Sequence, residues 1–274
     1  MWRSSPRPNG NPRAAASASP RSWFGTISIA FVAIAFSFPV ASATALFISE
    51  IAPTRVKKTL IALVDLMAAV PSVVFGLWGV YLLEGQIAGL SRWLSTWLSW
   101  IPLFRVTGAD PTNPLANETV YTASTFAAGI VVGLMVMPIQ CSVMREVFSQ
   151  APPGEREGAF ALGATRWGMV RAVVLPFGRG GMIGGTMLGL GRAMGETIAV
   201  LLIISPRFEI SGQILEAGSN SVSSLIALRY TEASGFGLSA LFAAGLALFC
   251  LTLVINFTAS AFVARSRSGA SSDG

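Results

Sequence analysis

Long apolar blocks are the feature that most limits how this chain can fold. Of its 274 residues, 53% are hydrophobic and 12% are charged, whereas soluble proteins of this length have about 25% charged residues. At least five blocks are long enough for a membrane span, which takes roughly 20 apolar residues. The sequence therefore predicts an all-α integral membrane protein, a polytopic helical bundle of about five transmembrane helices.

The expected organisation has three parts: an atypical or disordered tail at residues 1–22, a membrane domain at 23–265, and a cytoplasmic tail at 266–274. The predicted spans cover about residues 24–48, 60–83, 121–141, 177–204 and 236–263. Proline within a span, such as Pro71, is tolerated because packed neighbours satisfy the freed carbonyl, and it predicts a kink.

Three tryptophans lie between the second and third predicted spans. Trp93, Trp97 and Trp100 stand at helical spacing, so their indole rings would share one face of a helix. Such a face is typical of a helix lying in the membrane interface. A simple loop anchored by aromatic side chains fits the same residues, and both alternatives stay open.

Basic residues in short loops indicate which face is cytoplasmic. Loop 53–58 has three basic residues and no acid, and loop 142–176 has four arginines. Because spans alternate, these loops and the C-terminal tail share a face, which we expect to be the cytoplasmic one. The same alternation places the tail at 1–22, with four arginines, outside. We therefore expect that a preceding span is missing or replaced; a targeting extension is the less favoured alternative.

Composition excludes several function classes. The chain has no histidine, which excludes histidine-dependent acid–base catalysis and the usual histidine metal sites. The phosphate-cradling pattern Gly-x4-Gly-Lys-Ser/Thr is absent, so the chain carries no nucleotide site of that kind. We expect no metal and no cofactor here. Cys141 and Cys250 are expected to be packing residues, and the dispersed net charge of +6 fits membrane orientation better than nucleic-acid binding.

The loop on the predicted cytoplasmic face carries the most informative pattern. Glu157, Gly158 and Ala159 are followed by Gly163 and, after nine residues, by two valines with Leu175 and Pro176. The stretch from 157 to 162 is small and apolar enough for a short helix, which a glycine can end by adopting a positive φ. A short helix of small residues can dock in a groove of a partner.

This pattern resembles the EAA loop of ABC-importer permeases, with glycine in place of the first alanine. The resemblance implies a cytoplasmic coupling helix that binds a separate ATPase subunit and transmits its closure to the spans. The coupling residues that it implies are Glu157, Gly158, Ala159, Gly163, Leu175 and Pro176. From the residues alone, an interfacial helix without a partner remains the alternative.

Four further segments, 69–79, 145–148, 161–167 and 189–197, resemble the phosphate-specific (Pst) transporter permeases, the C subunit more than the A subunit. The resemblance covers about residues 26–264. It implies a phosphate-translocating subunit in the bacterial inner membrane that works with a second permease, two ATPase copies and an extracytoplasmic phosphate-binding protein. The family usually has six spans, and this chain shows five, lacking the first.

The fourth predicted span gives an independent reason to consider an anion. At about 100° per residue, six residues fall within roughly 80° of one another: Gly178, Gly181, Gly185, Gly189, Arg192 and Glu196. Glycines let helices approach closely, and an arginine at the bilayer centre costs about 2.5–3.5 kcal/mol. We predict that Arg192 contacts the permeating phosphate and that Glu196, one turn on, holds its guanidinium. The alternative is a pair that only fixes helix packing.

Three other functions stay open at this stage. The cargo could be another oxyanion or an organic solute, which the coupling loop does not discriminate. The chain could be an inactive fragment lacking its first span. A membrane-embedded enzyme is the least favoured, because the only clear charged pair within a span is Arg192 with Glu196.

Overall fold

The computed structural model describes residues 20–106, 118–204 and 213–268, most of which form helices. The α-helices are α2 Pro20–Leu46, α3 Thr54–Ala69, α4 Ser72–Trp78, α5 Glu84–Trp97, α6 Thr125–Ser149, α7 Pro153–Ala161, α8 Arg166–Met169, α9 Leu175–Gly195, α10 Ile198–Ile203, α11 Val222–Arg229 and α12 Phe236–Ser268. Three π-helical segments, Phe47–Ile51, Gly79–Leu83 and Val170–Val174, extend neighbouring helices. Most of the tails expected at 1–22 and 266–274 lies outside the described residues.

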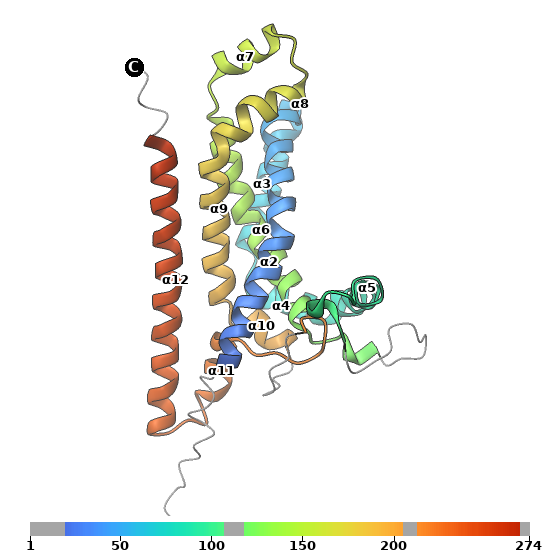
Figure 1. Cartoon of the computed structure of the whole chain (residues 1–274), viewed down its shortest axis with the longest axis vertical. Coiled ribbons are helices and arrows are strands. Elements are labelled where there is room, and N and C mark those ends of the chain that lie inside the picture. The colour runs from blue at the N-terminus through green and yellow to red at the C-terminus, as the bar shows by residue number, and fades with distance from the viewer. Residues whose placement is uncertain (1–19, 107–117, 205–212, 269–274) are drawn as a thin grey trace, which may run out of the picture.

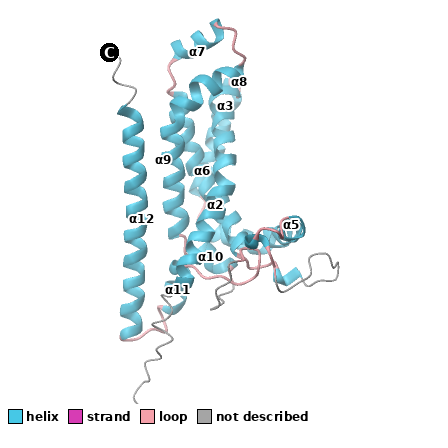
Figure 2. Cartoon of the chain, viewed as in Figure 1, coloured by secondary structure: helices cyan, strands magenta, loops and turns pink. Residues whose placement is uncertain are grey.

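The helices α2, α3, α6, α9 and α12 run side by side along the long axis of the molecule (Figure 1). Within the described residues, five helical segments are long and apolar enough to cross a membrane: Ser22–Ile51, Ser72–Trp97, Thr125–Ser149, Arg166–Gly195 and Phe236–Thr258. The predicted helical membrane bundle is thus confirmed, and Figure 2 shows helices and loops only in the part of the chain that is described.

The helices α2 and α6 form the centre of the bundle because small residues let their backbones approach closely. A Cβ placed on Gly129 of α6 would lie 2.5 Å from the Cβ of Val32 in α2. One on Gly133 would lie 2.9 Å from the carbonyl oxygen of Ala33. Around this contact, Val131, Val132 and their neighbours form a buried apolar core. In a membrane the hydrophobic effect does not drive helices together, so close van der Waals packing of this kind holds them in contact.

The second predicted span, 60–83, is wrong as a single helix. The helix α3 starts earlier, at Thr54, and ends at Ala69, because Val70 is extended (ψ 130°) before Pro71. A new helix then starts at Ser72. Proline here separates two helices instead of kinking one. In Figure 1, α4 continues below α3 at the lower end of the bundle.

The tryptophan segment forms a helix as far as Trp97, so its local structure is the predicted helix and not the simple loop. The helix α5 is seen end-on in Figure 1, so it crosses the direction of the bundle helices. Trp93 and Trp97 lie on it, and Trp100 lies in the turn beyond; all three are exposed. Its location relative to a membrane stays a prediction.

The two ends of the bundle carry different elements. The end of α2, the start of α3, the helices α7 and α8, and the C-terminal end of α12 lie at one end (Figure 1). The helices α5, α10 and α11 lie at the other. The three basic regions that were predicted to share a face therefore do so.

Candidate functional site

The helix α7 forms the tip of the molecule and ends as its sequence predicts. Gly163 has φ +83°, the left-handed region that favours glycine. Its N–H donates to the carbonyl of Phe160 (2.9 Å), and the N–H of Ala164 donates to the carbonyl of Ala159 (3.0 Å). These two bonds form a Schellman motif, which satisfies the last carbonyls of the helix. The predicted short helix with a glycine stop is confirmed.

One face of α7 is turned to the bundle and the other is free. Arg156 and Ala159, one turn apart, are half-buried, and Ala159 packs against the apolar cluster around Phe148. On the other face Glu157, Gly158 and residues 160–163 are exposed. The exposed fraction is 45% for Phe160 and 91% for Leu162. Two large apolar side chains therefore stand free at the tip.

The segment 162–174 joins α7 to α9. Thr165 caps α8, its hydroxyl oxygen accepting from the N–H of Gly168 at 3.1 Å. A π-helical segment, Val170–Val174, leads directly into α9, whose first residues are Leu175 and Pro176. Proline fits at this point because the first N–H groups of a helix have no helical acceptor.

The glycine face of α9 packs on α6, as the helical periodicity predicts. A Cβ on Gly178 would overlap the ring of Phe148, and one on Gly181 would lie 2.5 Å from the Cβ of Val147. One on Gly189 would overlap the side-chain amide of Gln140. Gly185 is buried in the same interface. The glycines therefore set the distance between these two helices.

Glu196 does not hold Arg192, and that part of the prediction is wrong. The helix α9 ends at Gly195, and Glu196 has an extended backbone (ψ 127°), so it leaves the face on which Arg192 lies. Glu196 is buried; its Oε1 accepts from the N–H of Ala199 at 3.2 Å, and its carbonyl accepts from the hydroxyl of Ser223 at 2.7 Å. A carboxylate there stabilises the positive end of α10.

Arg192 is exposed in the last turn of α9. Within the described residues no acidic side chain lies within 4.0 Å of its guanidinium. The free carbonyls at the end of α9 favour a cation at this position. Its hydrogen-bond donors are open to a ligand or to a second chain.

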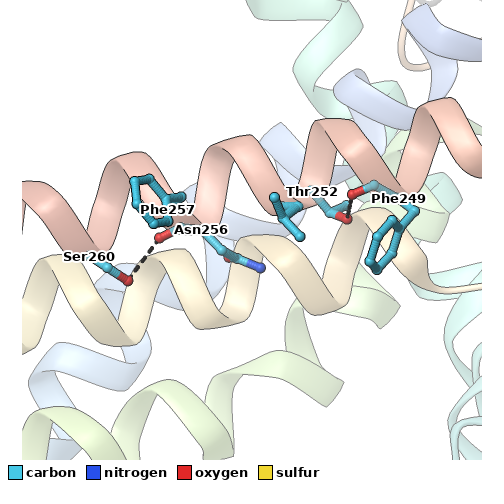
Figure 3. A pocket seen from close by; sticks show the side chains of 6 residues that line it. Phe249, Thr252, Asn256, Phe257 and Ser260 are labelled. Atoms are coloured by element: carbon cyan, nitrogen blue, oxygen red, sulfur yellow. Dashed lines mark hydrogen bonds between the residues drawn. The ribbon is translucent and has the colours of Figure 1, made fainter.

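A polar strip on α12 lies beside Gly191, the residue before Arg192, and was missed by the sequence reasoning. A Cβ on Gly191 would lie 3.0 Å from the side-chain amide of Asn256. Thr252, Asn256 and Ser260 repeat at four-residue spacing and line one groove of about 340 Å³ (Figure 3). The hydroxyls of Thr252 and Ser260 donate to carbonyls of α12 (Figure 3), whereas Asn256 has a free amide. The signal was available: an asparagine inside a long apolar run is costly in lipid.

A second missed feature is an ion pair between distant parts of the chain. Arg156 on α7 contacts Glu50, which lies in the π-helical segment after α2. The two residues are 106 positions apart, so no local pattern reveals the contact.

The sequence profile of the family described as "Binding-protein-dependent transport system inner membrane component" matches residues 37–268. Relatives from Mycobacterium bovis and Mycobacterium tuberculosis named "Phosphate transport system permease protein PstC 2" are each 41% identical over 231 residues, which cover 84% of this chain and 68% of the relative. A relative from Haemophilus influenzae, "Phosphate transport system permease protein PstC", is 35% identical over 241 residues, covering 84% of this chain and 71% of its own.

Solved structures of importers share the fold. A chain of the MetNI methionine ABC transporter in an inward-facing conformation superposes with a TM-score of 0.61 at 15% identity, covering 94% of this chain and 99% of its own. A chain of a bacterial ABC transporter that imports alginate superposes with a TM-score of 0.57 at 18% identity, covering 92% and 87%.

Proposed function

This chain belongs to the family of inner membrane components of binding-protein-dependent transport systems, and we propose that it is the permease subunit of an ATP-driven importer that moves inorganic phosphate across the bacterial inner membrane. Relatives at 35–41% identity that are named as phosphate permeases support phosphate over other oxyanions and organic solutes.

The observation that carries the proposal is the form of α7. It stands at the tip of the bundle with an exposed outer face, and it is fixed at its C-terminal end by the positive φ of Gly163. Exposed Phe160 and Leu162 suit burial in the groove of a partner. We assign that partner as a separate ATPase subunit, which hydrolyses ATP, so this chain needs no cofactor of its own.

The remaining partners follow from the same proposal. Two ATPase copies bind this chain and a second permease, and an extracytoplasmic phosphate-binding protein delivers the anion to the opposite end of the bundle. The multi-pass bundle lies in the inner membrane with α7 on the cytoplasmic side, as the basic loops favour.

Arg192 is the proposed anion contact. Its guanidinium presents several donors in a planar fork that matches phosphate oxygens, and no carboxylate competes for it among the described residues. Asn256 lies against Gly191, the residue before Arg192, and offers further donors. A charged arginine inside the membrane costs free energy, and this cost is lower where the side chain faces a water-filled path between two permeases.

Phosphate uptake by the reconstituted complex tests this assignment. Hydrogen bonds to charged groups contribute about 1.5–3 kcal/mol, so Arg192→Gln should lower uptake by roughly tenfold or more. The ATPase should still co-purify with the variant, because α7 is untouched. Sulfate and molybdate should compete poorly with phosphate in the wild-type complex.

Arg179→Gln is the matched control, since Arg179 is also exposed on α9 but lies near the α7 end. It should keep wild-type uptake. Uptake by Arg192→Gln at the wild-type rate would remove Arg192 from the pathway, and a wild-type complex that carries another solute in place of phosphate would refute the assigned cargo.

A further inference from the structure

Arg156 contacts two separate elements at the base of α7. Its Nη1 donates to Oε2 of Glu50 at 3.2 Å, and its Nη2 lies 3.1 Å from Oε1 of the same carboxylate. The same Nη2 donates to the carbonyl oxygen of Phe148 at 2.7 Å. One guanidinium therefore joins α7 to the end of α2 and to the end of α6.

The carboxylate of Glu50 depends on this contact. Its side chain is 5% exposed, and Oε1 has no hydrogen bond, so the charge of Arg156 is its compensation. Lys57 donates to the carbonyl of Ser49 (3.4 Å) and not to this carboxylate. A buried carboxylate without a cation is strongly unfavourable. The pair is therefore built into the fold and is not a chance contact on the surface.

Little else attaches α7 to the bundle. None of its residues is buried, and Ala159 supplies its apolar contact. Phe148, whose carbonyl Arg156 holds, is fully buried and presses its ring against Gly178 of α9. A displacement of α7 would thus act on α2 and α6 directly and on α9 through this ring.

We infer that Arg156 is a positioning residue that transmits displacement of α7 to the transmembrane helices through Glu50 and the Phe148 carbonyl. The inference rests on the proposed function, in which a subunit that hydrolyses ATP docks on α7. The ion pair works as a rigid link, because a planar guanidinium held by two hydrogen bonds and by a further charge contact with Oε1 has little freedom to turn.

Substitution of both partners separates this role from charge compensation. In Glu50→Gln/Arg156→Met the buried charge and the link are removed together, so the chain should assemble and co-purify with the ATPase. The complex should still hydrolyse ATP, but phosphate transported per ATP hydrolysed should fall at least fivefold. Arg156→Lys, which keeps the charge but loses the fork, should give an intermediate ratio. Hydrogen exchange of α7 amides should be faster in the double variant than in the wild type.

The matched control is Arg55→Met, which removes an exposed arginine at the same end of the bundle. It should keep the wild-type ratio. Wild-type transport per ATP in the double variant would overturn the inference, and so would loss of ATPase binding, because Arg156 would then serve assembly. A wild-type complex without ATP-driven uptake would instead refute the proposed function.

Discussion

Replacement of Gly181 with alanine tests whether the glycines of α9 set its distance from α6. The new Cβ would lie 2.5 Å from both Cβ and Cγ2 of Val147, where ordinary contact begins at 3.4 Å. Because the Cβ of valine is fixed to its backbone, rotation of the side chain does not relieve the overlap. The two helices have to separate by about 0.9 Å at this point.

The magnitude follows from comparison with Gly185, one turn further along the same face. A Cβ there would lie 3.3 Å from the carbonyl of Gln140 and 3.4 Å from the Cβ of Val143, so alanine fits with a shift of about a tenth of an ångström. Both substitutions gain about 1 kcal/mol of helix propensity, which cancels in the comparison. Overpacking costs about 1–3 kcal/mol, so Gly181→Ala should be less stable than Gly185→Ala by that amount.

Thermal unfolding of the two purified variants in the same detergent measures the difference. For a chain of this size about 2–4 °C corresponds to 1 kcal/mol, so a difference of 2 kcal/mol appears as about 4–8 °C. Gly185→Ala should unfold at or above the wild-type temperature. Equal Tm values for the two variants, or a lower value for Gly185→Ala, would refute the assignment of this face to the α6 contact.

Substitutions at Gly163, Glu196 and Asn256 test the site further. Gly163→Ala should weaken ATPase co-purification, because alanine at φ +83° costs about 1–2 kcal/mol. Gly154→Ala, in the first turn of α7 with open space around the added Cβ, should bind as well as wild type. Equal binding by both variants would contradict a role for the helix stop. Glu196→Gln should keep the hydrogen bond from the N–H of Ala199 and near-normal phosphate uptake. Glu196→Ala loses this bond and should be less stable by about 0.5–2 kcal/mol. A collapse of uptake in a stable Glu196→Gln variant would show that the negative charge is needed. Asn256→Leu should lower phosphate uptake severalfold with normal assembly, and unchanged uptake would place Asn256 outside the pathway.

Features that depend on residue type and short spacing could be predicted from the sequence. A glycine after a run of small residues predicted the end of α7, since few other residues adopt a positive φ. The glycine face of α9 followed from helical periodicity, because Gly178 to Gly189 repeat at spacings of three and four. The bundle itself followed from the length of the apolar blocks.

Features that depend on distant contacts could not be predicted. The helix α9 ends just before Glu196, whose carbonyl accepts a hydrogen bond from the hydroxyl of Ser223, 27 residues away. Because the sequence analysis treated 177–204 as one continuous helix, it placed Glu196 on the wrong face. The pairing of Glu50 with Arg156 likewise joins segments that only the fold brings together. Asn256 stands out in the sequence as a polar residue in an apolar run, but its contact with Gly191 could not be predicted.

Accessibility of α7 from the two sides of the membrane tests the account most directly. Leu162, 91% exposed at the tip, can be replaced by cysteine in a chain whose exposed Cys250 is changed to alanine and whose Cys141 is buried. A membrane-impermeant maleimide should label Leu162→Cys in inside-out vesicles only, and bound ATPase should protect it. Labelling in right-side-out vesicles, or unchanged labelling with the ATPase bound, would contradict a cytoplasmic docking helix.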